Sequence, residues 1–240
     1  MLFLLFAALI GVSISFTGFA FVAAEATPEA SPVAKSKMPA YFAGNAYDLV
    51  PQGQSGKLDV VLVGPLFGNA MPIVIRNNTK QPLDDVQATV EARDASGALL
   101  ASGKSVTVYP HYLIPGAVSL TYVYFQQPQN LTGATFIVTA TGKSPDSDSS
   151  SDYMVLNIAE VDLQTDHLVG MAHNDYSESV EIPSVYGECF NEEGAIIGYF
   201  EGFISSDIGP NDDAPFDVPL YGPDTCNLFL VVAAGHSSKF

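Results

Sequence analysis

Residues 77–97 read NNTKQPLDDVQATVEARDASG, and residues 174–194 read NDYSESVEIPSVYGECFNEEG. In each stretch an asparagine and a glycine lie 20 residues apart, at Asn77 and Gly97 and at Asn174 and Gly194. The second stretch follows the first at an offset of 97 residues. A period of this length predicts two whole domains rather than a solenoid of short repeats, and it assigns these four residues to structural turns.

The residues inside the first copy are typical of a β-strand. Between Val86 and Arg93 apolar and polar side chains alternate, which is the pattern of a half-buried antiparallel strand. Asp94-Ala95-Ser96-Gly97 then has the composition of a turn. Further strand-like segments are Leu58–Val63, Ile73–Ile75, Ala98–Val108, Ser119–Phe125 and Thr135–Ala140. Short strands, frequent turns and no helical periodicity predict an all-β fold, an antiparallel Ig-like β-sandwich.

The second copy repeats this plan. Its expected strands are Met154–Val161, His167–His173, Tyr199–Ser205 and Leu228–Ala234. We therefore expect two tandem sandwiches, residues 57–142 and 153–240, joined by a Ser/Asp-rich linker at 143–152. Asp146, Asp148 and Asp152 of the linker offer calcium ligands, but the glycine and terminal glutamate of a calcium loop are missing.

The two cysteines, Cys189 and Cys226, both lie in the second copy. Cys189 stands at the position of Ala92, which belongs to the apolar face of its strand, and Cys226 precedes the last strand. Inward positions on the facing sheets of a sandwich are close enough for a disulfide. Together with the export signal described next, this predicts an intramolecular Cys189–Cys226 bond.

The N-terminus has the composition of an export signal. Residues 1–24 carry no charge, begin with a dense apolar run and end in small residues, Val22-Ala23-Ala24. They are interpreted as a signal peptide or as an uncleaved anchor, which would be the chain's only membrane contact. Residues 25–56 follow as a Pro/Ala/Ser-rich tether and a lead-in that packs on the first domain. The expected location is secreted, extracellular or in the cell envelope.

The charge limits the partners. Nine Lys and Arg face 26 Asp and Glu, a formal net charge of −17. Such a surface repels phosphate backbones, so nucleic-acid binding is not expected. The acid is concentrated after residue 153, where Lys239 is the single basic residue. This pattern indicates either a solvated surface or attraction to cations or to a basic partner.

The repeat unit resembles the FxLYD domain, a small Ig-like β-sandwich of exported prokaryotic proteins. The matching residues of the first copy are Asn77, Asn78, Pro82, Leu83, Val86, Asp94, Gly97, Pro115, Gly116 and Phe125. The second copy keeps Asn174, Val180, Gly194 and the turn Gly209-Pro210, and neither copy contains the namesake Leu-Tyr-Asp. The resemblance implies an accessory or interaction role at the cell surface and no activity.

The sequence contains no catalytic motif and implies no cofactor. His167 and His173 are six residues apart on one expected strand and share a face, so that with Asp166 or Asp175 they are the candidates for a metal site. Two aromatic clusters, Tyr122/Tyr124/Phe125 and Tyr199/Phe200/Phe203, are the candidates for carbohydrate stacking, unless they fill the core.

The predicted function is therefore non-catalytic. We expect interaction, adhesion or envelope assembly with an unknown protein or glycan at the cell surface. A carbohydrate- or cation-binding module is the first alternative. A hydrolase with an interdomain site beside His167 or His173 is the second.

Overall fold

The computed structural model describes residues 37–126, 131–145, 153–222 and 225–238. The chain from Ser36 to Phe240 forms one compact unit. The predicted signal peptide, most of the tether and the three linker aspartates lie outside the described residues. Among the described residues no helix is long and apolar enough to cross a membrane.

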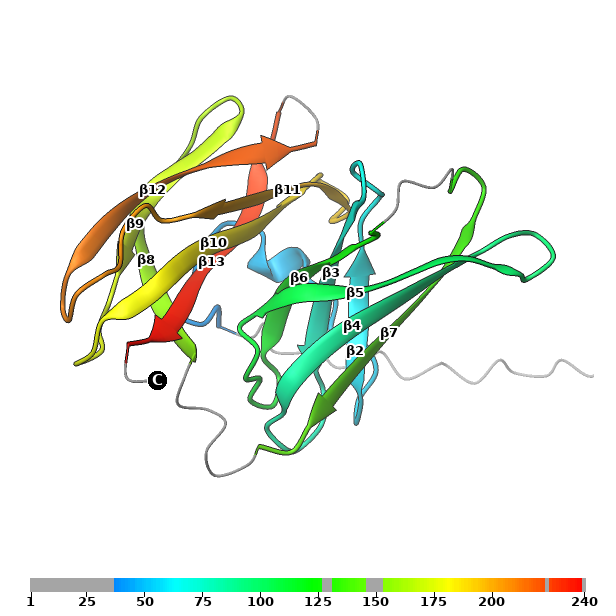
Figure 1. Cartoon of the computed structure of the whole chain (residues 1–240), viewed down its shortest axis with the longest axis horizontal. Coiled ribbons are helices and arrows are strands. Elements are labelled where there is room, and N and C mark those ends of the chain that lie inside the picture. Colours follow the sequence, from blue (N-terminus) through cyan, green and yellow to red (C-terminus); the bar gives the residue numbers. More distant parts are fainter. Residues whose placement is uncertain (1–36, 127–130, 146–152, 223–224, 239–240) are drawn as a thin grey trace, which may run out of the picture. The chain divides into compact units, whose positions relative to one another are not determined.

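The described chain is all-β, apart from a single turn of 3-10 helix (Figure 1). The elements are β1 (Phe42–Gly44), η1 (Tyr47–Leu49), β2 (Leu58–Val63), β3 (Ala70–Asn77), β4 (Asp84–Arg93), β5 (Leu99–Tyr109), β6 (Val118–Tyr124), β7 (Thr135–Lys143), β8 (Tyr153–Leu163), β9 (His167–His173), β10 (Val180–Phe190), β11 (Ile196–Phe203), β12 (Asp213–Tyr221) and β13 (Leu228–Ser237). The all-β prediction is confirmed.

Each copy of the sequence repeat forms its own antiparallel sheet. The first sheet has the order β2-β3-β6-β5-β4-β7. The second sheet has the order β8-β9-β12-β11-β10-β13, with β1 added at β13. Since β8 to β13 correspond in sequence to β2 to β7, the two orders are the same, and the repeat seen in the sequence is a repeat of topology.

The sheets are rolled up, whereas the sequence predicted Ig-like sandwiches, in which two sheets face each other. In the second sheet β13 also pairs with β8, from Ala233 opposite Leu156 to His236 opposite Tyr153, so six strands close into a ring. In the first sheet β2 and β7 do not pair. A rolled sheet buries its inner face against itself, and the alternation of apolar and polar residues is the same as in a sandwich strand.

Three apolar clusters hold the unit together. One fills the second sheet and includes Leu156, Leu168, Val185 and Phe216. Another fills the first sheet and includes Ile73, Ile75, Val90 and Val123. The third draws on both sheets and on the lead-in, and it contains Phe42, Tyr47, Val74, Tyr109, Leu120, Tyr122, Tyr186, Phe190, Tyr199, Leu230 and Val232. We call it the shared core.

The lead-in packs differently from the expectation. Its β1 pairs with β13 of the second sheet, and Phe42, Tyr47 and Val50 are buried. The buried Arg76 of β3 ties the segment to the first sheet, because its guanidinium donates to the carbonyl oxygens of Val50 and Pro51, at 3.3 and 3.0 Å, and to that of Gly116, at 3.1 Å. The lead-in therefore joins both sheets rather than covering the first.

Candidate functional site

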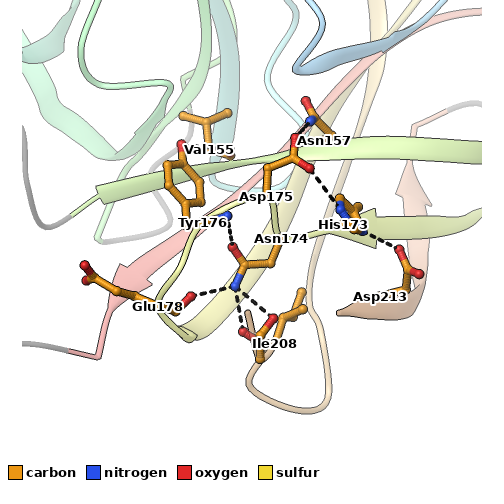
Figure 2. A network of polar contacts seen from close by, with 10 residues as sticks. Val155, Asn157, His173, Asn174, Asp175, Tyr176, Glu178, Ile208 and Asp213 are labelled. Carbon is orange, nitrogen blue, oxygen red and sulfur yellow. Dashed lines mark hydrogen bonds and ion pairs between the residues drawn. The ribbon is translucent and has the colours of Figure 1, made fainter. Parts of the chain in front are cut away.

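The two repeated asparagines hold loops from inside. Asn174 is fully buried, and its Nδ2 donates to the carbonyl oxygens of Glu178, Ile208 and Gly209, at 2.7 to 3.0 Å (Figure 2). Its Oδ1 accepts from the backbone N–H of Tyr176. In the first sheet the buried Asn77 makes the equivalent bonds to Gln81, Leu113 and Thr79. A side chain with two donors and an acceptor meets these needs, and apolar residues cannot.

We expect Asn174→Ala to lower the free energy of unfolding by about 2 kcal/mol, because buried carbonyl groups would lose their donor. Asn77→Ala should cost a similar amount, since its bonds are equivalent. Urea unfolding monitored by circular dichroism measures both. Asn157→Ala, on the surface strand β8, is the control and should change stability little. Equal values for Asn174→Ala and the control would contradict this assignment.

The two repeated glycines close tight turns. Gly97 has φ +85° and Gly194 has φ +80°, a conformation that other residues rarely adopt. Asp94 Oδ1 accepts from the backbone N–H groups of Ser96 and Ala98 in the first turn, and Asn191 Oδ1 accepts from Ala195 in the second. The backbone N–H of Gly97 donates to the carbonyl oxygen of Asp94, and that of Gly194 donates to the carbonyl oxygen of Asn191.

Cys189 and Cys226 are joined by a disulfide, with Cα atoms 5.7 Å apart. Cys189 is fully buried, as is Ala92 at the equivalent position of the first sheet. The location differs from the prediction in one respect. Cys226 precedes β13, which pairs with β10 at Cys189 and Phe229, so the bond joins β10 to the segment that leads into its neighbouring strand and does not link facing sheets.

His167 and His173 both point outward from the second sheet. Along β9 the side chains of Leu168 and Ala172 are buried, while the two histidines are partly exposed, as the six-residue spacing predicted. The strand pairs with β8 and β12. From the second sheet, the shared core draws instead on β10, β11 and β13, with partial cover from the start of β8. The histidines are therefore away from the contact between the sheets, where the hydrolase alternative required them.

His173 lies between two carboxylates. Its Nδ1 is 2.8 Å from Asp213 Oδ1, and its Nε2 is 2.9 Å from Asp175 Oδ1 (Figure 2). Asn157 Nδ2 donates to the other oxygen of Asp175. Both ring nitrogens can donate only when the imidazole is protonated. The hydrogen bond to Asp213 is the main cause that raises the pKa of His173, and the charges of Asp175 and Asp213 add to it.

His167 repeats this arrangement more loosely. Its Nδ1 is 2.7 Å from Asp217 Oδ1, and its Nε2 is 3.6 Å from Asp166 Oδ1. The hydrogen bond to Asp217 raises the pKa of His167, with help from the charge of Asp166. The hydrogen bonds of both rings go to aspartates. No serine, threonine or cysteine of the described chain bonds to either ring, so neither pair has the geometry of an activated nucleophile.

We expect the pKa of His173 to exceed its ordinary value of 6.5 and to fall in Asp213→Asn. A pKa raised by folding means that the folded state binds the proton more tightly. The resulting stability is complete below pH 6.5 and is lost as pH rises through the folded-state pKa. A proton NMR titration of the imidazole resonances measures the pKa. An unchanged value in Asp213→Asn would show that Asp213 has no influence.

These histidines lie within a larger acidic surface. We define the acidic face as the outer side of β8, β9 and β12 with its adjoining turns. Besides the two histidines it carries six exposed carboxylates: Glu160, Asp162, Asp166, Asp175, Asp213 and Asp217. Residues 153–238 contain no lysine or arginine, so only the histidines offset this charge. Within the described ranges no cluster of three or more His, Cys, Asp or Glu side chains could hold a metal ion.

The aromatic candidates are mostly structural. Tyr122 and Tyr199 stack with ring centroids 5.9 Å apart inside the shared core, and the Tyr122 hydroxyl donates to Glu201. Phe125 and Phe200 are buried in the interiors of the first and second sheets. Tyr124 and Phe203 are exposed, by 45% and 71%. The predicted stacking platforms are therefore not formed as sets, because their members divide between core and surface.

Among the buried charged side chains, Arg76 and Glu188 were not predicted. Arg76 and Glu188 show 1% and 0% of their surface to solvent. In the sequence Arg76 follows an apolar strand, and Glu188 alternates with the inward Cys189, so both have the pattern of solvent-facing positions. The contact between the sheets and the lead-in covers them.

No protein-family model matches the chain, and no curated protein sequence matches it.

Proposed function

We propose that this chain is a non-catalytic exported protein that binds a partner at the cell surface or in the envelope. The observation that carries the proposal is the acidic face. Among its described residues, His167 and His173 are the only basic side chains beside the carboxylates. A face of one charge attracts a partner of the opposite charge and speeds the encounter. The partner that fits best is a protein or peptide with clustered lysine or arginine.

Three further features support the proposal. The disulfide is typical of oxidising compartments, which fits export. The tandem, Ig-like FxLYD resemblance implies an interaction role for the two repeats. The aspartates beside His167 and His173 form hydrogen bonds and ion pairs with the rings, and no nucleophilic side chain of the described chain bonds to either ring.

Binding of a lysine-rich peptide to Ser36–Phe240, measured by calorimetry, tests the proposal. Affinity should fall with added salt, since exposed charges are screened over about 10 Å at 0.1 M ionic strength. The double variant Asp213→Asn/Asp217→Asn should bind more weakly. The control Glu192→Gln/Glu193→Gln removes the same charge from the turn between β10 and β11 and should bind nearly as the unaltered chain. Equal loss in both variants would point to net charge alone and contradict a specific face.

A glycan ligand is the second candidate. Tyr124 and Tyr221 are exposed by 45% and 44%, and Tyr221 stacks on the buried Tyr199 at 4.9 Å. Exposed aromatic rings bind sugars through their faces. A glycan panel tested against Tyr124→Ala and Tyr221→Ala decides this candidate. It fails if no glycan binds, or if binding is unchanged in both variants.

A further inference from the structure

The two sheets differ in whether their first and last strands pair with each other. In the second sheet β13 pairs with β8, which closes the ring. The equivalent strands of the first sheet, β7 and β2, form no backbone ladder with each other. Near the end of β7 the two strands nevertheless lie close to each other, and a Cβ at Gly142 would lie 3.4 Å from the Leu58 side chain. Among the described residues, β7 therefore forms a backbone ladder with β4 only, and its other edge carries no ladder, although β2 approaches it near Gly142.

Free edges in soluble proteins are usually protected by charges, prolines, bulges or short length. At the other end of the first sheet, β2 has an aspartate at its second position, Asp59, and a bulge between Val60 and Leu62. In the second sheet, β1 has only three residues. Residues 135–141 of β7 contain no charge and no proline, and they pair with β4 in regular register. This edge is long and has none of the usual protections.

The inward side chains at this edge are incompletely covered. Phe136, Val138 and Ala140 point into the first sheet and are only half-buried. In the closed second sheet, Val231 and Ala233 of the equivalent strand are fully buried. A further strand along β7 would cover the first set as β1 and β8 cover the second, with Ala43 opposite Val231 and Leu156 opposite Ala233.

We propose that a second copy of this chain supplies that strand, with two β7 strands pairing antiparallel edge to edge around Val138. This register sets Phe136 opposite Ala140 on the inner side, a large side chain against a small one. On the outer side it sets Ile137 opposite Thr139 and Thr135 opposite Thr141. Cross-strand pairs of this kind stabilise antiparallel sheets.

The distribution of charge favours β7 as the dimer interface. Two copies with a formal charge of −17 each repel over most of their surfaces. Residues 135–141 are neutral, and the nearby charges are compensated, since Glu91 pairs with Arg93 and Asp85 pairs with Lys143. The same edge on both molecules gives a closed twofold dimer. This inference goes beyond the proposed function and holds whatever the partner of the acidic face is.

Sedimentation equilibrium of the compact unit Ser36–Phe240 tests the dimer. The mass should rise from monomer to dimer with concentration, and hydrogen exchange at residues 135–141 should slow in parallel. Ile137→Lys/Thr139→Lys should remain monomeric, because each new lysine meets the other copy's edge. In the monomer, position 137 lies opposite Glu91, which compensates the new charge there.

The matched control is Gln87→Lys/Thr89→Lys. It adds the same charge on the same face but on β4, one strand inside the edge, and it should dimerise as the unaltered chain does. Circular dichroism shows whether each variant keeps its fold. A mass that stays monomeric at every concentration would overturn the proposal, and so would a dimer that persists in the β7 variant.

Discussion

Replacement of both cysteines, Cys189→Ala/Cys226→Ala, is expected to lower the free energy of unfolding by about 4 kcal/mol. The bond closes a loop between residues 37 positions apart, and the loss of that constraint on the unfolded chain gives this magnitude in the chain-entropy model. For a unit of this size the melting temperature should fall by about 10 °C. Differential scanning calorimetry measures both quantities.

The same experiment tests whether the two sheets unfold together. The neighbour of Cys189, Phe190, belongs to the shared core, which also contains Leu120 and Tyr122 of the first sheet. Loss of the second sheet would expose these residues, so we expect one transition that moves as a whole. Two transitions, of which only one has a lower melting temperature in the cysteine variant, would contradict a shared cooperative unit. Asn157→Ala in the disulfide-bonded chain controls for the effect of a surface substitution.

The repeat could be predicted from sequence because the residues that recur have strict local roles. Asn77 and Asn174 each satisfy buried backbone groups that an aliphatic side chain cannot. Gly97 and Gly194 have positive φ. Alternation in residues 86–93 predicted the strand and its buried face. Because Cys189 stands at the position of Ala92, the same pattern also predicted that Cys189 is buried.

Closure of the sheets could not be predicted in this way. A strand that lines a sandwich and one that lines a rolled sheet both alternate with period two. What distinguishes them is the pairing of β8 with β13, whose paired residues are about 80 apart in sequence, so the pairing leaves no local pattern. Strand β3 illustrates the difficulty, since all eight of its residues are buried although only one face belongs to the interior of its sheet.

The His–Asp pairs were predictable in part. The spacing of His167 and His173 indicated a common face, and Asp175 and Asp166 are near them in sequence. Asp213 and Asp217 come from β12, 40 and 50 residues later, and meet the histidines only through the pairing of β9 with β12. The positions of Asp213 and Asp217 in the sequence do not indicate that β12 places them beside the histidines.

Glu188→Met is expected to stabilise the protein by about 3 kcal/mol at neutral pH, since a buried carboxyl group without partners is costly and an apolar side chain of similar size is not. Glu188 lies in β10 between Tyr199 and Leu230 of the neighbouring strands, where the two sheets meet. Neither carboxyl oxygen has a hydrogen-bond partner. Burial raises the pKa of Glu188 well above its ordinary value of 4.5, and the backbone of Ile73 acts in the opposite direction.

The gain should depend on pH, and the direction follows from the raised pKa. Below pH 4.5 the carboxyl group is protonated in both the folded and the unfolded chain. As pH rises toward the folded-state pKa, only the unfolded chain releases the proton, and stability falls by at most about 1.4 kcal/mol per pH unit. Glu188→Met lacks this loss, so its advantage should increase with pH. Urea unfolding of both chains between pH 5 and 8 measures it.

Glu188→Gln separates charge from polarity. Glutamine cannot ionise, so the pH-dependent part of the difference should disappear, while its amide is still buried without partners and the gain at low pH should be smaller than with methionine. Glu201→Gln is the control for a partly buried carboxyl group that has a partner, because Glu201 accepts a hydrogen bond from Tyr122. It should not stabilise the protein as Glu188→Met does. If Glu188→Met destabilises the protein at every pH, the carboxyl group contributes to the contact between the sheets and is not a cost to it.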